Sequence, residues 1–371
     1  MKEITEEKME EIPLTDAAPK KRQAGLRAKL VIAGIALLAM LASGGCEKKE
    51  RLYIYNWTYY TPPSVIAKFE KEYNVTVIYD EFASNEDMYA KLKAGGGNYD
   101  IVFPSADYTS IMIHQNMLEK IDKSKVPNLV NVDPEVLKQA DYDPEMDYSV
   151  PYYFGAAGVV VNAAKVPNFD MSWSIFARKD LSGRMTMLDD MREVMGDALV
   201  HLGYSVNTVN PAEIEEAKNL INDSWKPNLV KFDAESFGKG YANGDFWVVQ
   251  GYPEVVFEEI ADNAQLMADT IFFIPNEGGP AYIDSMCILK GSKNIDLAHK
   301  FIDFIHRPEI YAEFADTFGF PATANIPARA YKTGDSWYSA EDLDKVELKK
   351  DLGSLLDLYN DAWFNSIRIG D

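Results

Sequence analysis

The feature that most restricts the fold of this chain is a regular alternation of strand-like and helix-like segments. Aromatic and β-branched residues predict strands at 52–55, 75–79 and 99–103. Between them, one helix is predicted from Pro62 onward. A second helix begins after Ser84, which can cap it, and ends before a run of three glycines. Because strands that alternate with helices form parallel sheets with right-handed crossovers, the sequence predicts an α/β fold.

A second α/β unit follows Pro151. Strands are predicted at 158–161, 184–188 and 246–249, and apolar residues at helical spacing predict a helix over 297–305. The chain has 371 residues, more than a typical single domain, and 47% of them are apolar, which is enough for buried cores. We therefore expect two lobes.

The segments that follow two of the predicted strands have the composition of a binding site. Asn-Trp-Thr-Tyr-Tyr at 56–60 follows the first strand, and Pro-Ser-Ala-Asp at 104–107 follows the third. Plain loops favour Gly and Asn, whereas these segments are aromatic or polar. Since ligands of α/β sheets bind at the carboxyl ends of strands, the pattern predicts a ligand crevice there.

Charge and cysteine content exclude several other classes of function. The formal net charge of −21 argues against nucleic acid, whose phosphates are bound by Lys and Arg. It suits cationic partners, although acidic surfaces also keep proteins soluble. The four histidines are scattered, and no Cys/His spacing resembles a zinc site, so we expect no metal and no cofactor. Cys287 is left without a partner if Cys46 has the role described next, which excludes a disulfide framework.

The first 46 residues resemble a bacterial lipoprotein leader. A basic stretch precedes an apolar run at 30–42, and small residues then lead to Cys46. That run is shorter than the roughly 20 residues of a membrane span. A cysteine after small residues resembles a lipobox, although Ser43 stands where Leu is usual, and an uncleaved signal anchor is the alternative. We expect a leader at 1–45 and a lipidated tether at 46–51, with the rest of the chain outside the cytoplasm.

Five segments form an ordered set that extends over nearly the whole chain after Cys46. They are Tyr-Asn-Trp-Thr-x-Tyr-x-Pro-Pro at 55–63, Ser-Asn-Glu-x-Met-Tyr-Ala-Lys-Leu-Lys at 84–93, Tyr-Asp-Ile-Val-x-Pro-Ser at 99–105, Asp-Asp-x-Arg-Glu-Val at 189–194 and Gly-Gly-x-x-x-x-Asp-Ser at 278–285. Together they resemble the spermidine/putrescine-binding proteins of bacterial ABC uptake systems. Five ordered motifs are far more specific than any one of them.

This resemblance implies a type II periplasmic-binding-protein fold. Each lobe would be a mainly parallel sheet flanked by helices, with the ligand in the interlobe cleft. On that pattern, lobe 1 is expected to hold 52–155 and 283–325, and lobe 2 to hold 156–282 and 326–371.

The resemblance also implies which residues bind the ligand. A polyamine is an apolar chain with an ammonium at each end, so it needs carboxylates at spaced points and aromatic walls between them. The residues that match the family are the aromatic Trp57, Tyr60 and Phe320, the polar Thr58 and Ser105, and the acidic Asp190, Glu193 and Asp284.

Two positions depart from the family pattern. Gln250 stands where the spermidine binders carry a Trp, so one wall is missing or replaced. Asp107 occupies a position that is aromatic in those binders, which adds an acid and removes a ring. Both changes leave the choice between putrescine and spermidine open.

The acidic residues also have structural interpretations that need no ligand. Asp190 and Glu193 are three residues apart at a predicted helix start, where they could share one ammonium or form a capping box, and the two roles can coexist. Asp284 follows Tyr282 by two residues, so on a strand both side chains face the same side. A solvent-facing Asp after the turn at Gly278-Gly279-Pro280 is the alternative for that residue.

The resulting expectation is a monomeric, polyamine-binding lipoprotein that delivers putrescine or spermidine to the permease subunits of an ABC transporter. It would be periplasmic, held to the outer leaflet of the cytoplasmic membrane by a lipid on Cys46, and would not be an enzyme. One alternative is the same fold with a sugar or amino acid as ligand. An amino acid would need an Arg, and Arg192 is expected to point away at helical spacing. The other alternative is a glycosidase that uses a pair of carboxylates.

Overall fold

The computed structural model describes residues 49–58 and 60–369. The predicted leader and Cys46 lie outside these described residues. From Glu50 onward the described residues form one compact unit. Within it, no helix is long and apolar enough to cross a membrane.

The first sheet contains the three strands that open the α/β pattern. Its order is β11-β10-β3-β1-β2, and β4 also pairs with β10. The strands β2, β1 and β3 are parallel to one another, as predicted, whereas β10 runs antiparallel to both β3 and β4. The strands are β1 (Arg51–Trp57), β2 (Thr76–Phe82), β3 (Ile101–Val102), β4 (Ser149–Ala156), β10 (Pro280–Ile288) and β11 (Glu347–Leu348).

The second sheet has the order β7-β6-β8-β5-β9. Here β6 is parallel to β7 and β8, whereas β5 is antiparallel to β8 and β9. Both sheets are therefore mixed, which refines the expectation of mainly parallel sheets. The strands are β5 (Gly158–Asn162), β6 (Met185–Met187), β7 (Leu229–Phe232), β8 (Val248–Gly251) and β9 (Thr270–Phe273).

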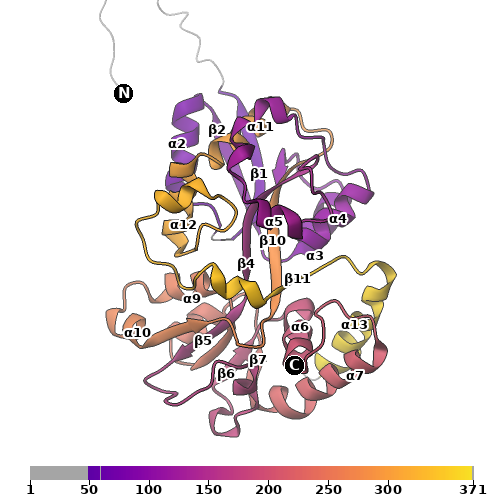
Figure 1. Ribbon diagram of the computed structural model, residues 1–371, viewed down its shortest axis with the longest axis vertical. Coiled ribbons are helices and arrows are strands. Elements are labelled where there is room, and N and C mark those ends of the chain that lie inside the picture. The colour runs from indigo at the N-terminus through magenta and orange to yellow at the C-terminus, as the bar shows by residue number, and fades with distance from the viewer. Residues whose placement is uncertain (1–48, 59, 370–371) are drawn as a thin grey trace, which may run out of the picture. The chain divides into compact units, whose positions relative to one another are not determined.

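Helices flank both sheets (Figure 1). The first sheet is accompanied by α2 (Pro63–Tyr73), α3 (Asn85–Lys93), α4 (Ala106–His114), α5 (Pro134–Gln139), α11 (Ile295–Ile305) and α12 (Pro308–Phe318). The second is accompanied by α6 (Met191–His201), α7 (Pro211–Leu220), α8 (Phe237–Ala242), α9 (Pro253–Ile260), α10 (Ala264–Asp269) and α13 (Leu356–Ala362).

The predicted helix signals have the expected local causes. Ser84 caps α3, because its Oγ accepts a hydrogen bond from the Asp87 N–H at 3.1 Å. In α11 the apolar residues that predicted the helix form one buried face against the first sheet, where Phe301 lies 5.1 Å from Phe69, ring centre to ring centre. Amphipathic spacing and capping therefore predicted these helices correctly.

The strands β4 and β10 connect the two sheets. They pair in antiparallel register from Ala281 opposite Ala156 to Cys287 opposite Ser149, and only Ala157 separates β4 from β5 of the second sheet. In Figure 1 the two strands run side by side through the middle of the described unit. Residues on β10 are therefore positioned by backbone hydrogen bonds to β4 next to the point where the chain passes into the second sheet.

Gly155 on β4 is required by the rings around it. A Cβ at this position would lie 2.7 Å from the Tyr282 hydroxyl and 2.7 Å from the Tyr153 ring. No side chain fits at that distance, so the glycine leaves space for Tyr282, which is its partner on β10.

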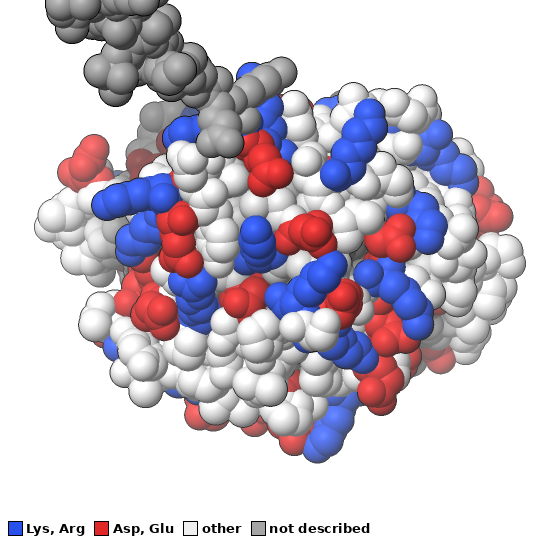
Figure 2. All heavy atoms as spheres, turned by 90° about the horizontal axis from the view of Figure 1, so that it is seen from above, with Lys and Arg blue, Asp and Glu red and all other residues white. Residues whose placement is uncertain are grey.

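Acidic and basic side chains alternate on the surface near the helices of the first sheet. Arg307 lies 2.8 Å from Glu72, and Lys125 lies 2.6 Å from Asp296. Figure 2 shows red and blue residues interspersed over the face that it presents. On this face the net negative charge is not gathered into one acidic patch.

Gly278 provides a test of how β10 is held at its start. Its φ is +89°, and a Cβ there would lie only 2.0 Å from the Lys345 carbonyl oxygen. Gly183 also has a positive φ, of +74°, but has open space around its Cβ position. We expect Gly278→Ala to lower the free energy of unfolding by about 2 kcal/mol or more, and Gly183→Ala by about 1 kcal/mol.

The measurement is urea unfolding of residues 47–371, monitored by circular dichroism. The two variants share the cost of a positive φ, so the difference between them isolates the contact with Lys345. Equal losses in the two variants would show that this contact does not constrain β10.

Candidate functional site

Asp284 on β10 is the centre of the candidate site. The residue is only 4% exposed, and its carboxylate accepts two hydrogen bonds, from Ser105 Oγ at 2.6 Å and from the Tyr60 hydroxyl at 2.7 Å. The structure therefore brings together three residues predicted from separate motifs. The solvent-facing alternative for Asp284 is wrong, because β10 lies inside the first sheet.

Burial sets the protonation of Asp284. It raises the pKa of this carboxyl to about 6, although the hydrogen bonds from Ser105 and Tyr60 and the charge of Lys349 act in the opposite direction. Asp107 adds to the increase through its own negative charge. A carboxyl in this state gains stability as an ion when a cation is placed beside it.

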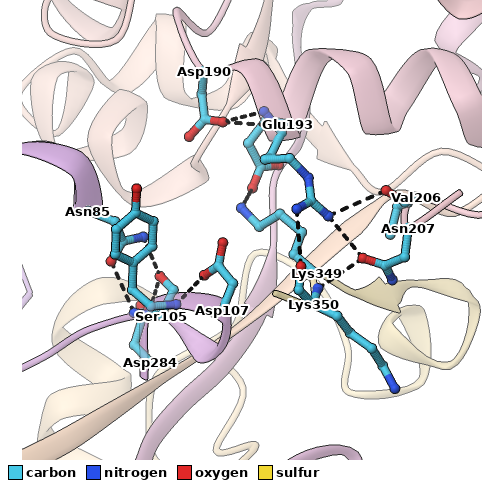
Figure 3. A network of polar contacts seen from close by, with 12 residues as sticks. Asn85, Ser105, Asp107, Asp190, Glu193, Val206, Asn207, Asp284, Lys349 and Lys350 are labelled. Carbon is cyan, nitrogen blue, oxygen red and sulfur yellow. Dashed lines mark hydrogen bonds and ion pairs between the residues drawn. The ribbon is translucent and has the colours of Figure 1, made fainter. Parts of the chain in front are cut away.

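Asn85 orients Ser105 and was missed by the sequence reasoning. Its Nδ2 donates to Ser105 Oγ at 3.0 Å, and its Oδ1 accepts from the Ser105 N–H at 3.2 Å (Figure 3). Asn85 is the first residue of α3, within a motif already recognised. The motif signalled the segment but not this role.

Asp190 caps α6. Its Oδ1 accepts the N–H groups of Arg192 and Glu193 at 2.9 and 3.0 Å, so the capping interpretation is correct for this residue. Glu193 does not complete a capping box. Its carboxylate forms a hydrogen-bonded ion pair with Lys349 instead, as Figure 3 shows.

Lys349 lies in the candidate site without any signal in the sequence. It follows β11, and the residue is 7% exposed, whereas Glu193 is fully buried. Burial lowers the pKa of Lys349, but the carboxylates of Glu193, Asp190 and Asp107 raise it more strongly, so it stays above its ordinary value. Burial raises the pKa of Glu193 despite the neighbouring ammonium. A lone lysine in a charged segment carries no motif that would have predicted this position.

Glu254 is an acid that the sequence analysis missed. It lies in the first turn of α9, directly after Tyr252-Pro253 at the end of β8. Burial raises the pKa of its carboxyl to about 8, and the charge of Asp284 adds to this, although the residue as a whole is only half-buried. The rule that ligands lie at strand ends could have identified it.

The predicted aromatic residues lie at different depths. Trp57 is half-buried, and its Nε1 donates to the Phe103 carbonyl at 2.8 Å. Phe320 is fully buried and stacks on Tyr153 at 4.3 Å, with Tyr60 at 6.3 Å. Phe320 therefore packs against Tyr153 and Tyr60 within the core.

Tyr282 and Thr58 also differ in how deeply they are buried. Tyr282 is buried, and its ring centre lies 5.7 Å from that of Tyr252, with the two rings edge to face. Thr58 is exposed at the end of β1, where its N–H donates to the Phe82 carbonyl at 3.3 Å. Of the two, Tyr282 is the one packed among the aromatic residues of the site.

The two departures from the family pattern are engaged in different ways. Asp107, half-buried, accepts the Tyr108 N–H at 3.0 Å in the first turn of α4. In Figure 3 its carboxylate lies between the Asp284 group and the Lys349 group. Gln250 is fully buried, and its Oε1 accepts the Leu188 N–H at 2.7 Å, so it fastens β8 to the segment that leads into Asp190. At the position where the family carries an aromatic ring, Gln250 thus fixes the loop that leads to Asp190.

Arg192 points away from these acids, as expected. Its guanidinium donates to the Lys350 carbonyl at 3.1 Å and to Asn207 Oδ1 at 2.9 Å. The site therefore gathers carboxylates and aromatic rings, with Lys349 as a basic group beside them. Among the described residues, no group of three or more His, Cys, Asp and Glu side chains is arranged to hold a metal ion. The combination of carboxylates and aromatic rings suits an organic cation.

Comparison with known proteins gives the same family as the motifs. A model of the bacterial extracellular solute-binding protein family matches residues 64–341. The chain is 36% identical over 349 residues to the spermidine/putrescine-binding periplasmic protein of Escherichia coli (strain K12), which covers 92% of this chain and 98% of the relative. It is 32% identical to the putrescine-binding periplasmic protein PotF of the same organism, over 80% of this chain and 84% of the relative.

Solved structures agree. The Tp0655 (TpPotD) lipoprotein of Treponema pallidum matches with a TM-score of 0.83 and 52% identity, over 86% of this chain and 99% of that one. A putative spermidine/putrescine ABC transporter protein from Listeria monocytogenes matches with a TM-score of 0.75 and 32% identity, over 86% and 99%. These neighbours confirm the predicted two-lobed type II periplasmic-binding-protein fold. The chain therefore belongs to the bacterial extracellular solute-binding protein family and, within it, to the spermidine/putrescine-binding proteins.

Proposed function

We propose that this chain is an extracytoplasmic receptor that binds putrescine or spermidine and delivers it to the permease subunits of an ABC transporter. The observation that carries the proposal is the buried Asp284 carboxylate, which is held by Tyr60 and Ser105 beside aromatic rings. One ammonium of the ligand would pair with Asp284. Asp190, at the start of α6, would attract another, and the rings between would contact the apolar chain.

The burial of the site supports closure around the ligand. Tyr60 and Asp284 are at most 5% exposed, and Glu193 is fully buried, so a polyamine would reach them only when the lobes part. The strands β4 and β10 link the sheets and are the proposed hinge region. The proposed lobes keep the predicted ranges, 52–155 plus 283–325 and 156–282 plus 326–371.

The partners follow from the same proposal. The relatives compared above are named as binding or transport proteins, which supports a receptor without catalytic activity. The Treponema relative is named a lipoprotein, which supports lipidation at Cys46 and a periplasmic position at the outer leaflet of the cytoplasmic membrane. We propose that the receptor is monomeric. The engagement of Arg192 with backbone and Asn207 disfavours an amino acid as ligand.

Calorimetric titration tests the ligand class. Residues 47–371 hold both sheets, and we expect submicromolar binding of putrescine, spermidine or spermine and no binding of glutamate or maltose. Asp284→Asn should weaken binding at least about tenfold, because an ammonium would lose its buried charge partner. Asp296→Asn removes an exposed acid that pairs with Lys125, and should leave the affinity unchanged. Heat from a control solute with none from any polyamine would contradict the proposed ligand class.

Asp190 allows charge to be separated from capping. Asn is as good an N-cap as Asp, so Asp190→Asn should keep the stability of α6 while polyamine affinity falls at least about tenfold. Asp190→Ala should lower both, with about 1 kcal/mol lost in urea unfolding. Unchanged affinity in Asp190→Asn would limit this residue to the helix cap.

The pKa of Asp284, about 6, predicts a pH dependence of binding. Below pH 6 an ammonium must displace a proton from this carboxyl, so affinity should fall about tenfold from pH 7 to pH 5. The ligand amines stay charged in this window, as does Lys349. Glu254, whose pKa is about 8, stays mostly protonated.

The same calorimetric titration at the two pH values is the measurement. Asp296→Asn should show the drop seen in the unmodified chain, and Asp284→Asn should lose it. Equal affinity of the unmodified chain at pH 7 and pH 5 would show that no proton is displaced from Asp284.

A further inference from the structure

The ion pair between Lys349 and Glu193 lies inside the proposed binding site. The Lys349 side chain is 9% exposed and that of Glu193 is not exposed at all. The negative charges of Asp190 and Asp107 also raise the pKa of the Lys349 ammonium, and the positive charge of Lys349 lowers the pKa of Asp284. The chain therefore places one of its own ammonium groups among the carboxylates that would bind those of the ligand.

The segment that carries Lys349 is held in place. The Lys349 N–H donates to the Ala281 carbonyl at 3.0 Å, directly before Tyr282 on β10. Asn207 fixes both neighbouring residues, because its Nδ2 donates to the Leu348 carbonyl at 2.9 Å and its Oδ1 accepts the Lys350 N–H at 2.9 Å. Figure 3 shows Lys349 directed toward Glu193 and Lys350 directed away from it.

A buried ion pair of this kind is weak support for stability, because two charges must be removed from water. It also means that the charge of Glu193 is already balanced by an ammonium of the chain itself. A lysine side chain ends in a primary ammonium on a flexible alkyl chain, which is the same chemical group as one end of a polyamine. Lys349 thus occupies a buried carboxylate that would otherwise be open to an ammonium of the ligand.

We propose that Lys349 is a built-in ammonium that sets the specificity of the site, so that the chain prefers a diamine to a triamine. This inference rests on the proposed function and extends it. Asp284 and Asp190 remain for the two ammonium groups of a diamine, whereas a triamine would have to displace Lys349 from Glu193 or leave one ammonium beside it. In both cases the triamine is disfavoured by repulsion between like charges or by the loss of the ion pair.

The test compares the affinities of putrescine and spermidine in residues 47–371 and in Lys349→Gln, by calorimetry at pH 7.5. The unmodified chain should bind putrescine more tightly. Lys349→Gln frees Glu193 and should raise the ratio of spermidine affinity to putrescine affinity at least about tenfold. The matched control is Lys350→Gln, since Lys350 is exposed and pairs with Asp141, outside the acid group; its ratio should not change.

A second variant guards against loss of folding when Glu193 is left unpaired. In Lys349→Gln/Glu193→Gln neither charge remains, and the affinity ratio should return to within about threefold of the unmodified chain, because the third ammonium has no carboxylate to meet. Thermal unfolding of each variant shows whether the folded state persists.

The outcomes separate the two proposals. Polyamine binding with an unchanged ratio in Lys349→Gln would overturn the role of Lys349 and leave the proposed function intact. A tighter fit for spermidine in the unmodified chain would do the same. No binding of any polyamine to the unmodified chain would overturn both.

Discussion

The pairing of β4 with β10 is the constraint on which the rest of the structure depends. Seven register pairs join these strands within the first sheet, and only Ala157 separates the end of β4 from β5 of the second sheet. The same ladder sets Asp284 opposite Tyr153 and Tyr282 opposite Gly155. An acid and a ring of the site are therefore positioned by backbone hydrogen bonds, which hold side chains more accurately than loops do.

The acids of the site are costly to bury without a ligand. Burial raises the pKa of Asp284, Glu193 and Glu254; hydroxyl donors and Lys349 offset this only in part for Asp284, and Lys349 offsets it only in part for Glu193. In the proposed site an arriving ammonium would supply the missing countercharge, so part of the binding free energy would come from relieving the cost of burying these carboxyl groups. Under this proposal the selectivity for cations comes from the buried acids, because acidic and basic residues alternate on the surface near the first sheet.

Sequence reasoning predicted the elements with strong local signals, such as α3 from its Ser84 cap and α11 from its apolar spacing. It also brought Tyr60, Ser105 and Asp284 into one site, because strand ends and motifs point to the same place. It did not predict the antiparallel direction of β10, since strand pairing depends on contacts far apart along the chain. Lys349 and Asn85 were missed for the same reason, as their roles arise only from tertiary contacts.

The position of Lys349 after β11, rather than on a central strand, has an evolutionary consequence. Its side chain meets Glu193, whereas its link to β10 runs through its backbone N–H, which any residue except proline can supply. A lysine codon becomes a glutamine codon through one base change. A lineage could therefore alter the number of charges that its receptor accepts in one mutational step, while every aromatic residue of the site is inherited unchanged.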